Sequence, residues 1–360
     1  MPRTTTISLR LAPILLFALL CSAATGQSAA SERPDTAGRN AAPEQALATP
    51  QQPAPAQLAP KYPVAPRQSV AVGFWNLENF YDTIPSPFYD DTEYTPQGAK
   101  HWDTERYNQK VKNLARVLDD MSLDVAGLGE VENEATVRDL VTALKTDYCY
   151  IHRTTSDLRG MDMALLYKGD KFIPERVRQV DIHSTREALY VRGLLLGERV
   201  DIVVCHLPSN FNDYDYRARA IRALYDFSDS LQRADPGARL IIMGDMNASA
   251  DERIFKENFP LERYGPLVNA LANELTQRRG SYAYGSRWQL IDNIFISGGL
   301  LYGPGLRRAQ SGIFIRDYML SQGSAALRKG YPLRTFVGDT YTGGFSDHLP
   351  VYIIFEKASQ

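Results

Sequence analysis

Carboxylate, amide and imidazole side chains border four apolar stretches of this sequence, each with the length and composition of a buried strand. The bordering residues are Asn76, Glu130, Asp245 with Asn247, and Asp347 with His348. Strands of one sheet can bring such side chains to a single edge, where α/β proteins place their binding sites. Oxygen ligands beside an imidazole can bind a hard cation and move a proton, so this combination predicts a catalytic site.

Each border also has a non-catalytic interpretation when taken alone. Asp347 can cap a turn, and His348 can be an ordinary surface histidine. Asp245 and Asn247 can close their strand in an Asx turn. Four such borders in one chain favour catalysis, because packing alone gives no reason for a polar group at every strand end.

Six polar segments follow one another along the chain: Asn76, Glu130, His206 in CHLPS, GDMN at 244–247, Asp292 in LIDNIF, and the SDH segment that ends at His348. This ordered set resembles the endonuclease/exonuclease/phosphatase superfamily over about residues 68–357. The superfamily contains deoxyribonucleases, apurinic endonucleases, inositol polyphosphate 5-phosphatases and bacterial sphingomyelinases. The resemblance is specific for the superfamily and not for a substrate.

Glu130 is the expected metal ligand, because Mg²⁺ prefers carboxylate oxygen and keeps waters that a substrate phosphate can replace. The alternative is a solvated acid at a strand end. The resemblance implies that Asp347 is the second carboxylate near the metal. It also implies that Asn76 is an amide that positions Glu130, the cation or the phosphate. We expect Mg²⁺ as the cofactor, with Mn²⁺ or Ca²⁺ as alternatives.

Asp245 and Asn247 can point to one site from alternate positions after a strand. There Asp245 can orient or deprotonate a water, and Asn247 can bind phosphoryl oxygens. His348 needs an orienting acid, and Asp292 is the candidate because a lone acid in an apolar strand is costly unless paired. Such a pair favours a protonated His348 facing the phosphoryl group. Whether the aspartate or the histidine is the general base stays open.

His206 narrows the branch of the superfamily that the chain resembles. Deoxyribonucleases, 5-phosphatases and sphingomyelinases have a histidine in this position, whereas apurinic endonucleases have an asparagine. We expect His206 to protonate the leaving group or contact phosphate, although a structural histidine is the alternative. Asp162 resembles the acid that orients this histidine. Arg159 lies just before it and is expected to bind phosphate through paired donors.

The elements that must position these residues are alternating strands and helices at the start of the folded part. A helix capped by Asp103 or Thr104 is expected, with Lys110 pointing away from its apolar face. That face consists of Tyr107, Val111, Leu114 and Leu118. A second amphipathic helix is expected over 137–144, after the strand that ends at Glu130.

Residues 160–206 change to short β-like runs separated by turns, which predicts a meander and hence mixed sheets. We therefore expect an α/β fold in which a two-sheet mixed β sandwich is flanked by helices, a four-layer α/β sandwich. The resemblance implies the same fold. A single catalytic domain is expected over 68–360.

Residues 1–26 have the pattern of a secretory signal peptide. Arg3 and Arg10 precede an apolar stretch that is shorter than the roughly 20 residues of a membrane span. Export to the periplasm or the exterior is expected, without a stable membrane span. Lipid attachment through Cys21 is the less favoured alternative, because the preceding Leu20 is not small. Residues 27–67 are rich in Ala, Pro and Gln and are expected to form a disordered linker.

The formal net charge of −2 gives no basic footprint, so clamping of nucleic acid through bulk charge is not indicated. Arginine and aromatic residues alternate before the Asp292 strand, which is compatible with nucleic-acid binding or with an ordinary hairpin surface. These are Arg278, Arg279, Tyr282, Tyr284, Arg287 and Trp288. Beyond Cys21, only Cys149 and Cys205 remain, and their pairing stays open.

The sequence thus predicts an exported, metal-dependent phosphoesterase that acts without a covalent intermediate. A nuclease-like phosphodiesterase on DNA or RNA is preferred, and a monomer is expected. One alternative is a phosphatase or phospholipase C-type enzyme on a lipid or sugar phosphate. A second alternative is a catalytically inactive binding module.

Overall fold

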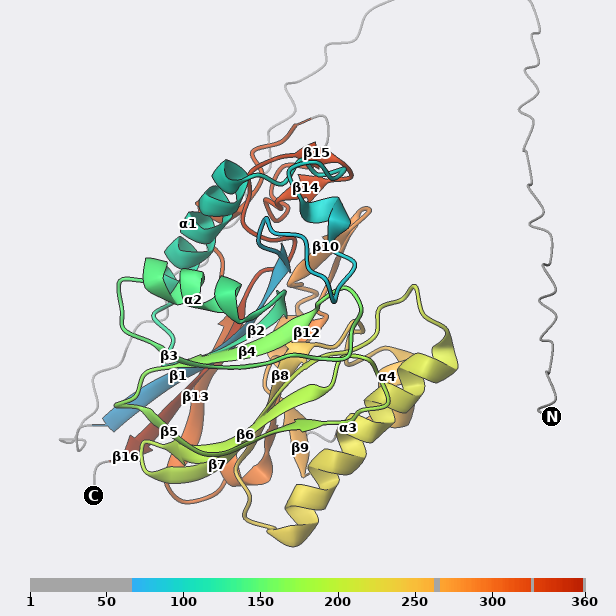
Figure 1. Ribbon diagram of the computed structural model, residues 1–360. Coiled ribbons are helices and arrows are strands. Elements are labelled where there is room, and N and C mark those ends of the chain that lie inside the picture. The colour runs from blue at the N-terminus through green and yellow to red at the C-terminus, as the bar shows by residue number, and fades with distance from the viewer. Residues whose placement is uncertain (1–66, 262–265, 325–326, 359–360) are drawn as a thin grey trace, which may run out of the picture. The chain divides into compact units, whose positions relative to one another are not determined.

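Two six-stranded sheets form the centre of the computed structural model, which describes residues 67–261, 266–324 and 327–358 (Figure 1). The expected signal peptide, the lipid-attachment alternative at Cys21 and the linker lie outside the described residues, apart from Arg67, which begins the first strand. All described residues belong to one compact unit, 60–360.

The first sheet is mixed, with a single parallel pair, β1 and β2. Its strands, in spatial order, are β13 (Leu306–Ile313), β16 (Val351–Ala358), β1 (Arg67–Phe80), β2 (Val125–Val131), β4 (Asp162–Tyr167) and β3 (Cys149–Arg153). The last strand of the chain, β16, therefore pairs with the first, β1, in antiparallel register.

The second sheet is also mixed, with β7 and β8 as its parallel pair. Its order is β5 (Phe172–Val180), β6 (Ala188–Leu195), β7 (Glu198–His206), β8 (Leu240–Asp245), β12 (Asp292–Ser297) and β9 (Leu267–Asn269). Two short hairpins lie outside the sheets: β10 (Tyr282–Tyr284) with β11 (Arg287–Gln289), and β14 (Phe336–Val337) with β15 (Thr340–Tyr341).

Helices cover the outer faces of both sheets, so the molecule has four layers. The helices are α1 (Thr104–Met121), α2 (Glu134–Ala143), α3 (Tyr214–Ala234), α4 (Arg253–Asn258) and α5 (Ala272–Thr276). Residues of α1 and α2 pack on the first sheet, and residues of α3 and α4 pack on the second. This arrangement confirms the expected four-layer α/β sandwich.

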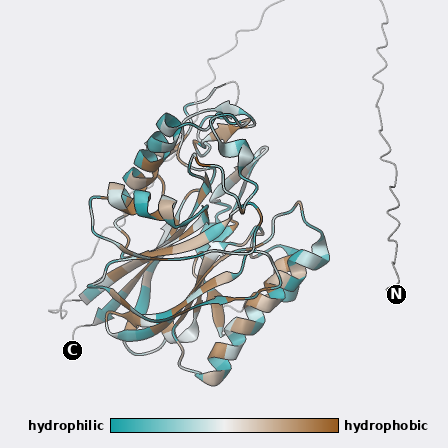
Figure 2. Cartoon of the chain, in the orientation of Figure 1, coloured by the Kyte–Doolittle hydropathy of each residue, from teal (hydrophilic) through white to brown (hydrophobic). Residues whose placement is uncertain are grey.

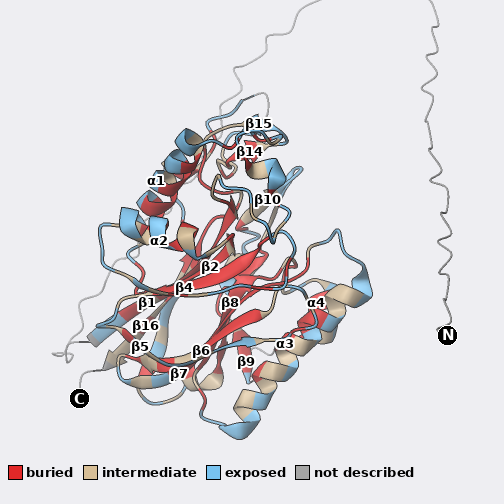
Figure 3. Cartoon of the chain, in the orientation of Figure 1, coloured by how far each residue is buried: buried red, intermediate tan, exposed pale blue. Residues whose placement is uncertain are grey.

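The main core fills the space between the sheets. Phe74 of β1 and Met163 of β4 share one buried cluster with Val204 of β7 and Met243 of β8. Alternate residues of each strand point into this cluster, as the two-residue period of a strand requires. Figures 2 and 3 show the result: apolar, buried strands inside and polar, exposed faces on the helices.

The first expected helix is confirmed as α1, and so is its cap at Asp103. The Asp103 side chain accepts a hydrogen bond from the backbone N–H of Arg106 at 2.9 Å. The expectation that Lys110 points away from the apolar face of this helix was wrong, because its side chain is buried with that face and is only 1% exposed. The connection between β13 and β16 covers this position and supplies oxygen acceptors. Lys110 Nζ donates to Thr335 Oγ1 and to the carbonyl oxygen of Phe345, each at 2.6 Å.

The meander expected over 160–206 is only partly present. The strands β5, β6 and β7 form an antiparallel meander in the second sheet, but β4 belongs to the first sheet, where it pairs with β2 and β3. The chain thus crosses between sheets after β4. Cys149 is exposed, Cys205 is buried, and both are free thiols. Among the described residues, no helix combines the length and hydropathy needed to cross a membrane.

Candidate active site

The polar residues of the sequence motif meet at one edge shared by both sheets, which we call the polar edge. The strands β7 and β8 end there with His206 and Asp245 as parallel partners. The antiparallel strand β12 begins there, with Asp292 opposite Asp245. Strand β2 ends there too, with Val131 opposite Asp162. Strand direction therefore explains why acids at strand starts and at strand ends gather in one place.

Asn76 joins the two sheets at this edge. Its side chain is fully buried, and Nδ2 donates to Glu130 Oε1 at 3.1 Å and to Asp245 Oδ2 at 3.0 Å. Its Oδ1 accepts from the backbone N–H of Glu78 at 2.9 Å. One amide thus holds an acid of the first sheet and an acid of the second, which matches the positioning role expected for Asn76.

Four residues other than glycine adopt left-handed backbone conformations at the polar edge. Their φ angles are 55° for Glu78, 48° for Asn79, 58° for Glu130 and 48° for Asn247. Such conformations are unfavourable for a residue like glutamate and persist only where surrounding contacts enforce them. Here the backbone N–H of Asn79 donates to Glu130 Oε2 at 2.7 Å. The irregular end of β1 is therefore shaped to hold the Glu130 carboxylate.

The oxygen donors at this edge fit a hard divalent cation. Burial by itself would raise the pKa of Glu130, but the hydrogen bonds from Asn76 and Asn79 and the charge of His348 hold it below its usual value. The carboxylate therefore stays charged. Its side chain is 17% exposed and that of Asp347 is 16% exposed, so solvent reaches both. Glu130 and Asp347 can serve as the expected ligands, with Asn76 beside them.

A second group of possible ligand atoms consists of Asp245, Asp292 and His348, whose donor atoms lie within 4.8 Å of one another. Two of these residues are already bonded: His348 Nδ1 lies 2.7 Å from Asp292 Oδ2. A buried His–Asp hydrogen bond of this kind orients the imidazole for proton chemistry. We therefore interpret this group as acid–base machinery, and Glu130 as the cation ligand.

The expected partnership of Asp292 and His348 is reinforced from several sides. Ser281 Oγ donates to Asp292 Oδ2 at 2.6 Å, and Trp75 Nε1 donates to the carbonyl oxygen of His348 at 2.9 Å. The ring of Tyr282 packs on the imidazole at 4.8 Å between centroids. Burial alone disfavours the charged imidazole, but the carboxylates of Asp292, Asp347 and Asp245 hold the pKa of His348 well above its usual range. These contacts fix a protonated imidazole.

Asp245 lies between the two histidines of the site. Its Oδ2 is 3.8 Å from His348 Nε2 and 3.5 Å from His206 Nε2. Burial raises the pKa of Asp245 to about 7, with His348 opposing the rise and Asp292 adding to it. A carboxylate with such a pKa can accept a proton from water near neutral pH.

Asn247 makes the Asx turn that was the alternative interpretation, because its backbone N–H donates to Asp245 Oδ1 at 2.8 Å. Its Nδ2 also donates to the carbonyl oxygen of Leu207 at 2.8 Å. The turn therefore orients Asp245 and leaves the second proton of the Asn247 amide for another acceptor. Asn247 can therefore close the turn and still bind a phosphoryl oxygen.

His206 reaches the site, but with a partner that the sequence did not suggest. Arg186 Nη1 lies 2.9 Å from His206 Nε2, and Arg186 Nε donates to Asp157 Oδ2 at 2.9 Å. Burial and the Arg186 charge hold the pKa of His206 well below its usual range. A neutral imidazole that accepts from arginine does not fit the expected role as leaving-group acid. With Nε2 bonded to Arg186 and Nδ1 buried, the other expected role of His206, contact with phosphate, stays a prediction.

Asp162 does not orient His206, which corrects the expectation from the resemblance. Its Oδ2 lies 2.9 Å from His152 Nε2, and its Oδ1 accepts from the Thr155 backbone N–H at 2.7 Å. The β3–β4 register explains this choice: His152 is paired with Ala164, so Asp162 lies two residues away on the same face.

Arg159 lies at the rim of the polar edge. Its Nη2 donates to Asn79 Oδ1 at 3.0 Å, and Asn79 in turn binds Glu130. This position is compatible with the expected phosphate contact. The sequence did not identify Arg186 and Arg334 as site residues, because each lies in a connection between strands, where no periodic pattern marks a position.

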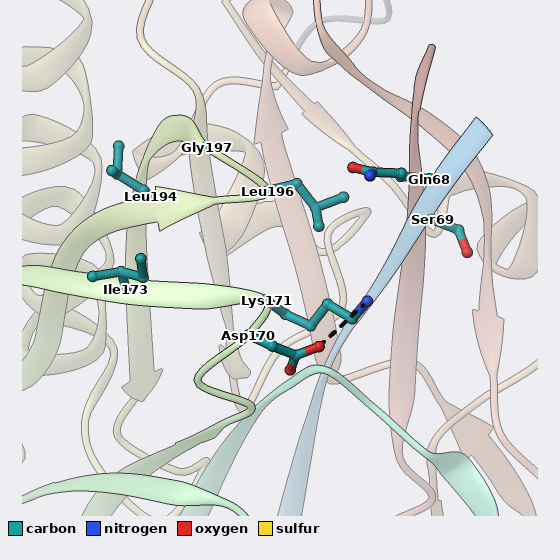
Figure 4. A pocket seen from close by; sticks show the side chains of 8 residues that line it. All are labelled: Gln68, Ser69, Asp170, Lys171, Ile173, Leu194, Leu196 and Gly197. Atoms are coloured by element: carbon teal, nitrogen blue, oxygen red, sulfur yellow. Dashed lines mark ion pairs between the residues drawn. The ribbon is translucent and has the colours of Figure 1, made fainter. Parts of the chain in front are cut away.

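A separate pocket lies away from the polar edge and is not a candidate for catalysis. Figure 4 shows that residues at the start of β1 line it together with the β4–β5 connection and the β6–β7 turn. Its lining is Gln68, Ser69, Asp170, Lys171, Ile173, Leu194, Leu196 and Gly197. The ionisable pair within it, Asp170 and Lys171, makes a 3.7 Å ion pair, and Asp170 is largely exposed.

Residues 71–357 match the model of the Endonuclease/Exonuclease/phosphatase family. No curated protein is significantly similar in sequence to the chain. The solved structures that share its fold include the following three. TDP2 of D. rerio complexed with single strand DNA product has 16% identity and a TM-score of 0.54, over 80% of this chain and 98% of that chain. An endonuclease/exonuclease/phosphatase family protein from Bacteroides thetaiotaomicron has 16% identity and a TM-score of 0.54, over 81% and 96%. A mannosyl-6-phosphatase from the same organism has 16% identity and a TM-score of 0.51, over 79% and 99%.

Proposed function

The chain belongs to the Endonuclease/Exonuclease/phosphatase family, and we propose that it is an exported, divalent-metal-dependent nuclease-like phosphodiesterase. It would hydrolyse nucleic-acid phosphodiester bonds by direct attack of water. The observation that carries this proposal is the Asn76 side chain, which bonds the metal-ligand candidate Glu130 and the base candidate Asp245 at 3.1 and 3.0 Å. A cation site and a proton acceptor are thereby held side by side.

Glu130 and Asp347 would hold a divalent cation, with Mg²⁺ as the first choice. When bound, the cation supplies positive charge that polarises the phosphoryl oxygens. The lowered pKa of Glu130 keeps this ligand ionised near neutral pH. No protonation step then competes with metal binding at Glu130.

Asp245 would accept the proton of the attacking water, because its pKa of about 7 suits it to this task near neutral pH. The protonated His348, with its Nε2 at 3.8 Å from Asp245 Oδ2, would place positive charge against the phosphoryl group. Arg186, whose Nη1 lies 2.9 Å from His206 Nε2, would donate to phosphate oxygens from the opposite side of Asp245. Arg159 adds a further cation at the rim.

The β10–β11 hairpin supports nucleic acid as the substrate class. Tyr282 forms a bridge with His348, so the hairpin is fixed directly beside the catalytic imidazole. Tyr284 on the same hairpin is 69% exposed, and aromatic rings in such a position can stack on bases. The likeness to D. rerio TDP2, whose structure was solved with a single-stranded DNA product, supports the same class.

A phosphatase acting on a sugar phosphate is the second candidate. It is favoured by the near-neutral formal charge of −2, which offers no extended basic surface for a polyanion. The likeness to a mannosyl-6-phosphatase covers nearly as much of the chain as the likeness to TDP2. Export of either enzyme would follow from the signal-like residues 1–26.

Hydrolysis by the purified protein tests both candidates. Plasmid DNA, RNA, a phospholipid panel, mannose 6-phosphate and bis(4-nitrophenyl) phosphate would be offered with Mg²⁺ and with a chelator, and His348→Ala would serve as the inactive control. Chelator-sensitive cleavage of DNA or RNA that is lost in the variant would establish the nuclease. Turnover of the monoester without cleavage of nucleic acid would establish the phosphatase instead. Metal binding without hydrolysis of any substrate would favour the other alternative, a catalytically inactive binding module.

A further inference from the structure

Arg334 lies between two carboxylates at the polar edge and belongs to none of the six polar segments of the sequence. Its Nε donates to Glu78 Oε1 at 3.1 Å, and its Nη2 donates to Asp347 Oδ2 at 2.8 Å. The Glu78 side chain is 4% exposed, whereas that of Arg334 is 31% exposed. The guanidinium is thus anchored on its buried side and reaches solvent beside a candidate metal ligand.

Glu78, which anchors the Arg334 guanidinium, does not depend on Arg334 for its own position. Glu78 Oε2 accepts from the backbone N–H of Thr335 at 2.6 Å, and Lys110 Nζ lies 4.0 Å from the same oxygen. The buried Glu78 carboxylate is therefore held by a main-chain donor and a second cation. Arg334 can change its other partner without leaving Glu78.

Main-chain pairing brings Arg334 next to Asp347. The N–H of Gly344 donates to the carbonyl oxygen of Arg334 at 3.2 Å, and the N–H of Phe345 donates to that of Leu333 at 2.6 Å. The segment that carries Arg334 therefore runs beside the segment that leads into Asp347. The contact between the two side chains follows from this backbone arrangement and not from the reach of a flexible surface arginine.

The Asp347 carboxylate cannot interact at full strength with both Arg334 and a divalent cation at the same time. Positive charges brought to one carboxylate repel each other, so a bound cation weakens the bond from Nη2. A guanidinium released in this way presents N–H donors in the planar fork that matches phosphate oxygens. Glu78 keeps the released group at the polar edge.

We propose that Arg334 is a phosphate-binding residue that acts as the counterion of Asp347 until a divalent cation binds. Nη2 then exchanges the Asp347 carboxylate for a phosphate oxygen of the substrate, while Nε stays on Glu78. This inference rests on the proposed phosphoesterase function and assigns a substrate contact to the connection between β13 and β16.

The test compares the wild-type chain with Arg334→Met and Arg334→Lys. Arg328→Met is the matched control, because Arg328 is an exposed arginine in the same connection. Mn²⁺ binding is measured by calorimetry without substrate, and kcat and KM are measured with bis(4-nitrophenyl) phosphate. Removing a positive charge that competes for Asp347 should tighten Mn²⁺ binding by roughly fivefold in Arg334→Met. The KM should rise by roughly tenfold with a smaller change in kcat, since one charge-assisted contact to phosphate is lost.

A merely structural arginine gives the opposite metal result. If Arg334 only orients Asp347, Arg334→Met binds Mn²⁺ more weakly and leaves KM unchanged, and the proposal fails. Unchanged Mn²⁺ affinity also overturns it. Should Arg334→Met not fold, Arg334→Lys decides, because a lysine keeps the charge but cannot hold Glu78 and Asp347 together; its KM must then exceed that of Arg328→Met. If the wild type hydrolyses nothing, the proposed function fails, whereas the Mn²⁺ titration still decides whether Arg334 competes with the cation.

Discussion

The imidazole Nδ1 of His348 lies 2.7 Å from Oδ2 of Asp292, although 56 residues separate them in the chain. Asp292 begins β12 of the second sheet, and His348 lies in the connection just before β16 of the first sheet. Their hydrogen bond therefore crosses the sandwich at the polar edge, as the Asn76 bonds do. Catalytic geometry in this fold depends on how the two sheets are aligned.

Replacing Asp292 by Asn should lower the pKa of His348, because Asp292 is the strongest of the carboxylates that raise it. The imidazole then loses its proton at a lower pH, so kcat/KM should fall by roughly a hundredfold at pH 8 and by less at pH 6. The pH profile of kcat/KM and an NMR titration of His348 check this. A uniform loss of activity at both pH values would contradict the role in holding the proton.

Glu130→Gln tests the cation site directly. The variant loses the carboxylate charge that a hard cation needs, so Mn²⁺ affinity should fall by at least about tenfold and hydrolysis by roughly a hundredfold or more. The amide keeps the size of the side chain and can still contact Asn76, so the fold should persist. Glu175→Gln, on the edge strand β5, is the matched control because Glu175 is exposed. Equal Mn²⁺ binding by both variants would move the cation to other ligands.

Lys110 should give the protein a measurable dependence of stability on pH. Burial lowers its pKa from 10.5 to about 8, against the opposing charges of Glu78, Asp347 and Glu130. Between these two values the unfolded chain binds a proton that the folded chain has released, so the lysine's contribution to the free energy of unfolding rises with pH. The full gain across this window is about 3 kcal/mol.

The comparison is wild type against Lys110→Met, by urea denaturation at pH 7.5 and pH 9.5. Other titrating groups are common to both proteins and cancel in the difference. The variant should be less stable at both pH values, because Thr335 and Phe345 lose a donor; at pH 7.5 Glu78 also loses a cation. The wild type should gain on it between pH 7.5 and pH 9.5. A difference that stays constant with pH would contradict a depressed pKa.

The four-layer fold and the main site residues could be predicted because each depends on local pattern. Buried strands have apolar runs, and the groups at their ends, such as Glu130 and Asp245, are visible in the sequence. The pairing of strands decides which strand ends lie next to each other, and no local pattern in the sequence encodes that pairing. Asp162 therefore contacts His152 and not His206, because of the register between β3 and β4. Lys110 was misplaced for a similar reason: its acceptors, Thr335 and Phe345, come from a connection more than 200 residues away.

Tyr284 separates the two substrate classes, because it can stack on a base but lies on a hairpin that a small monoester need not touch. Tyr284→Ala should weaken binding of single-stranded DNA or RNA by roughly tenfold, the range expected for one lost stacking contact, and leave any KM for mannose 6-phosphate, a monoester without an aromatic ring, unchanged. Tyr302→Ala is the matched control: Tyr302 is 59% exposed, compared with 69% for Tyr284, but follows the far end of β12, away from the polar edge. Fluorescence anisotropy with a labelled oligonucleotide measures the affinity. Equal affinities for the two variants would remove the hairpin from the substrate path and favour the phosphatase.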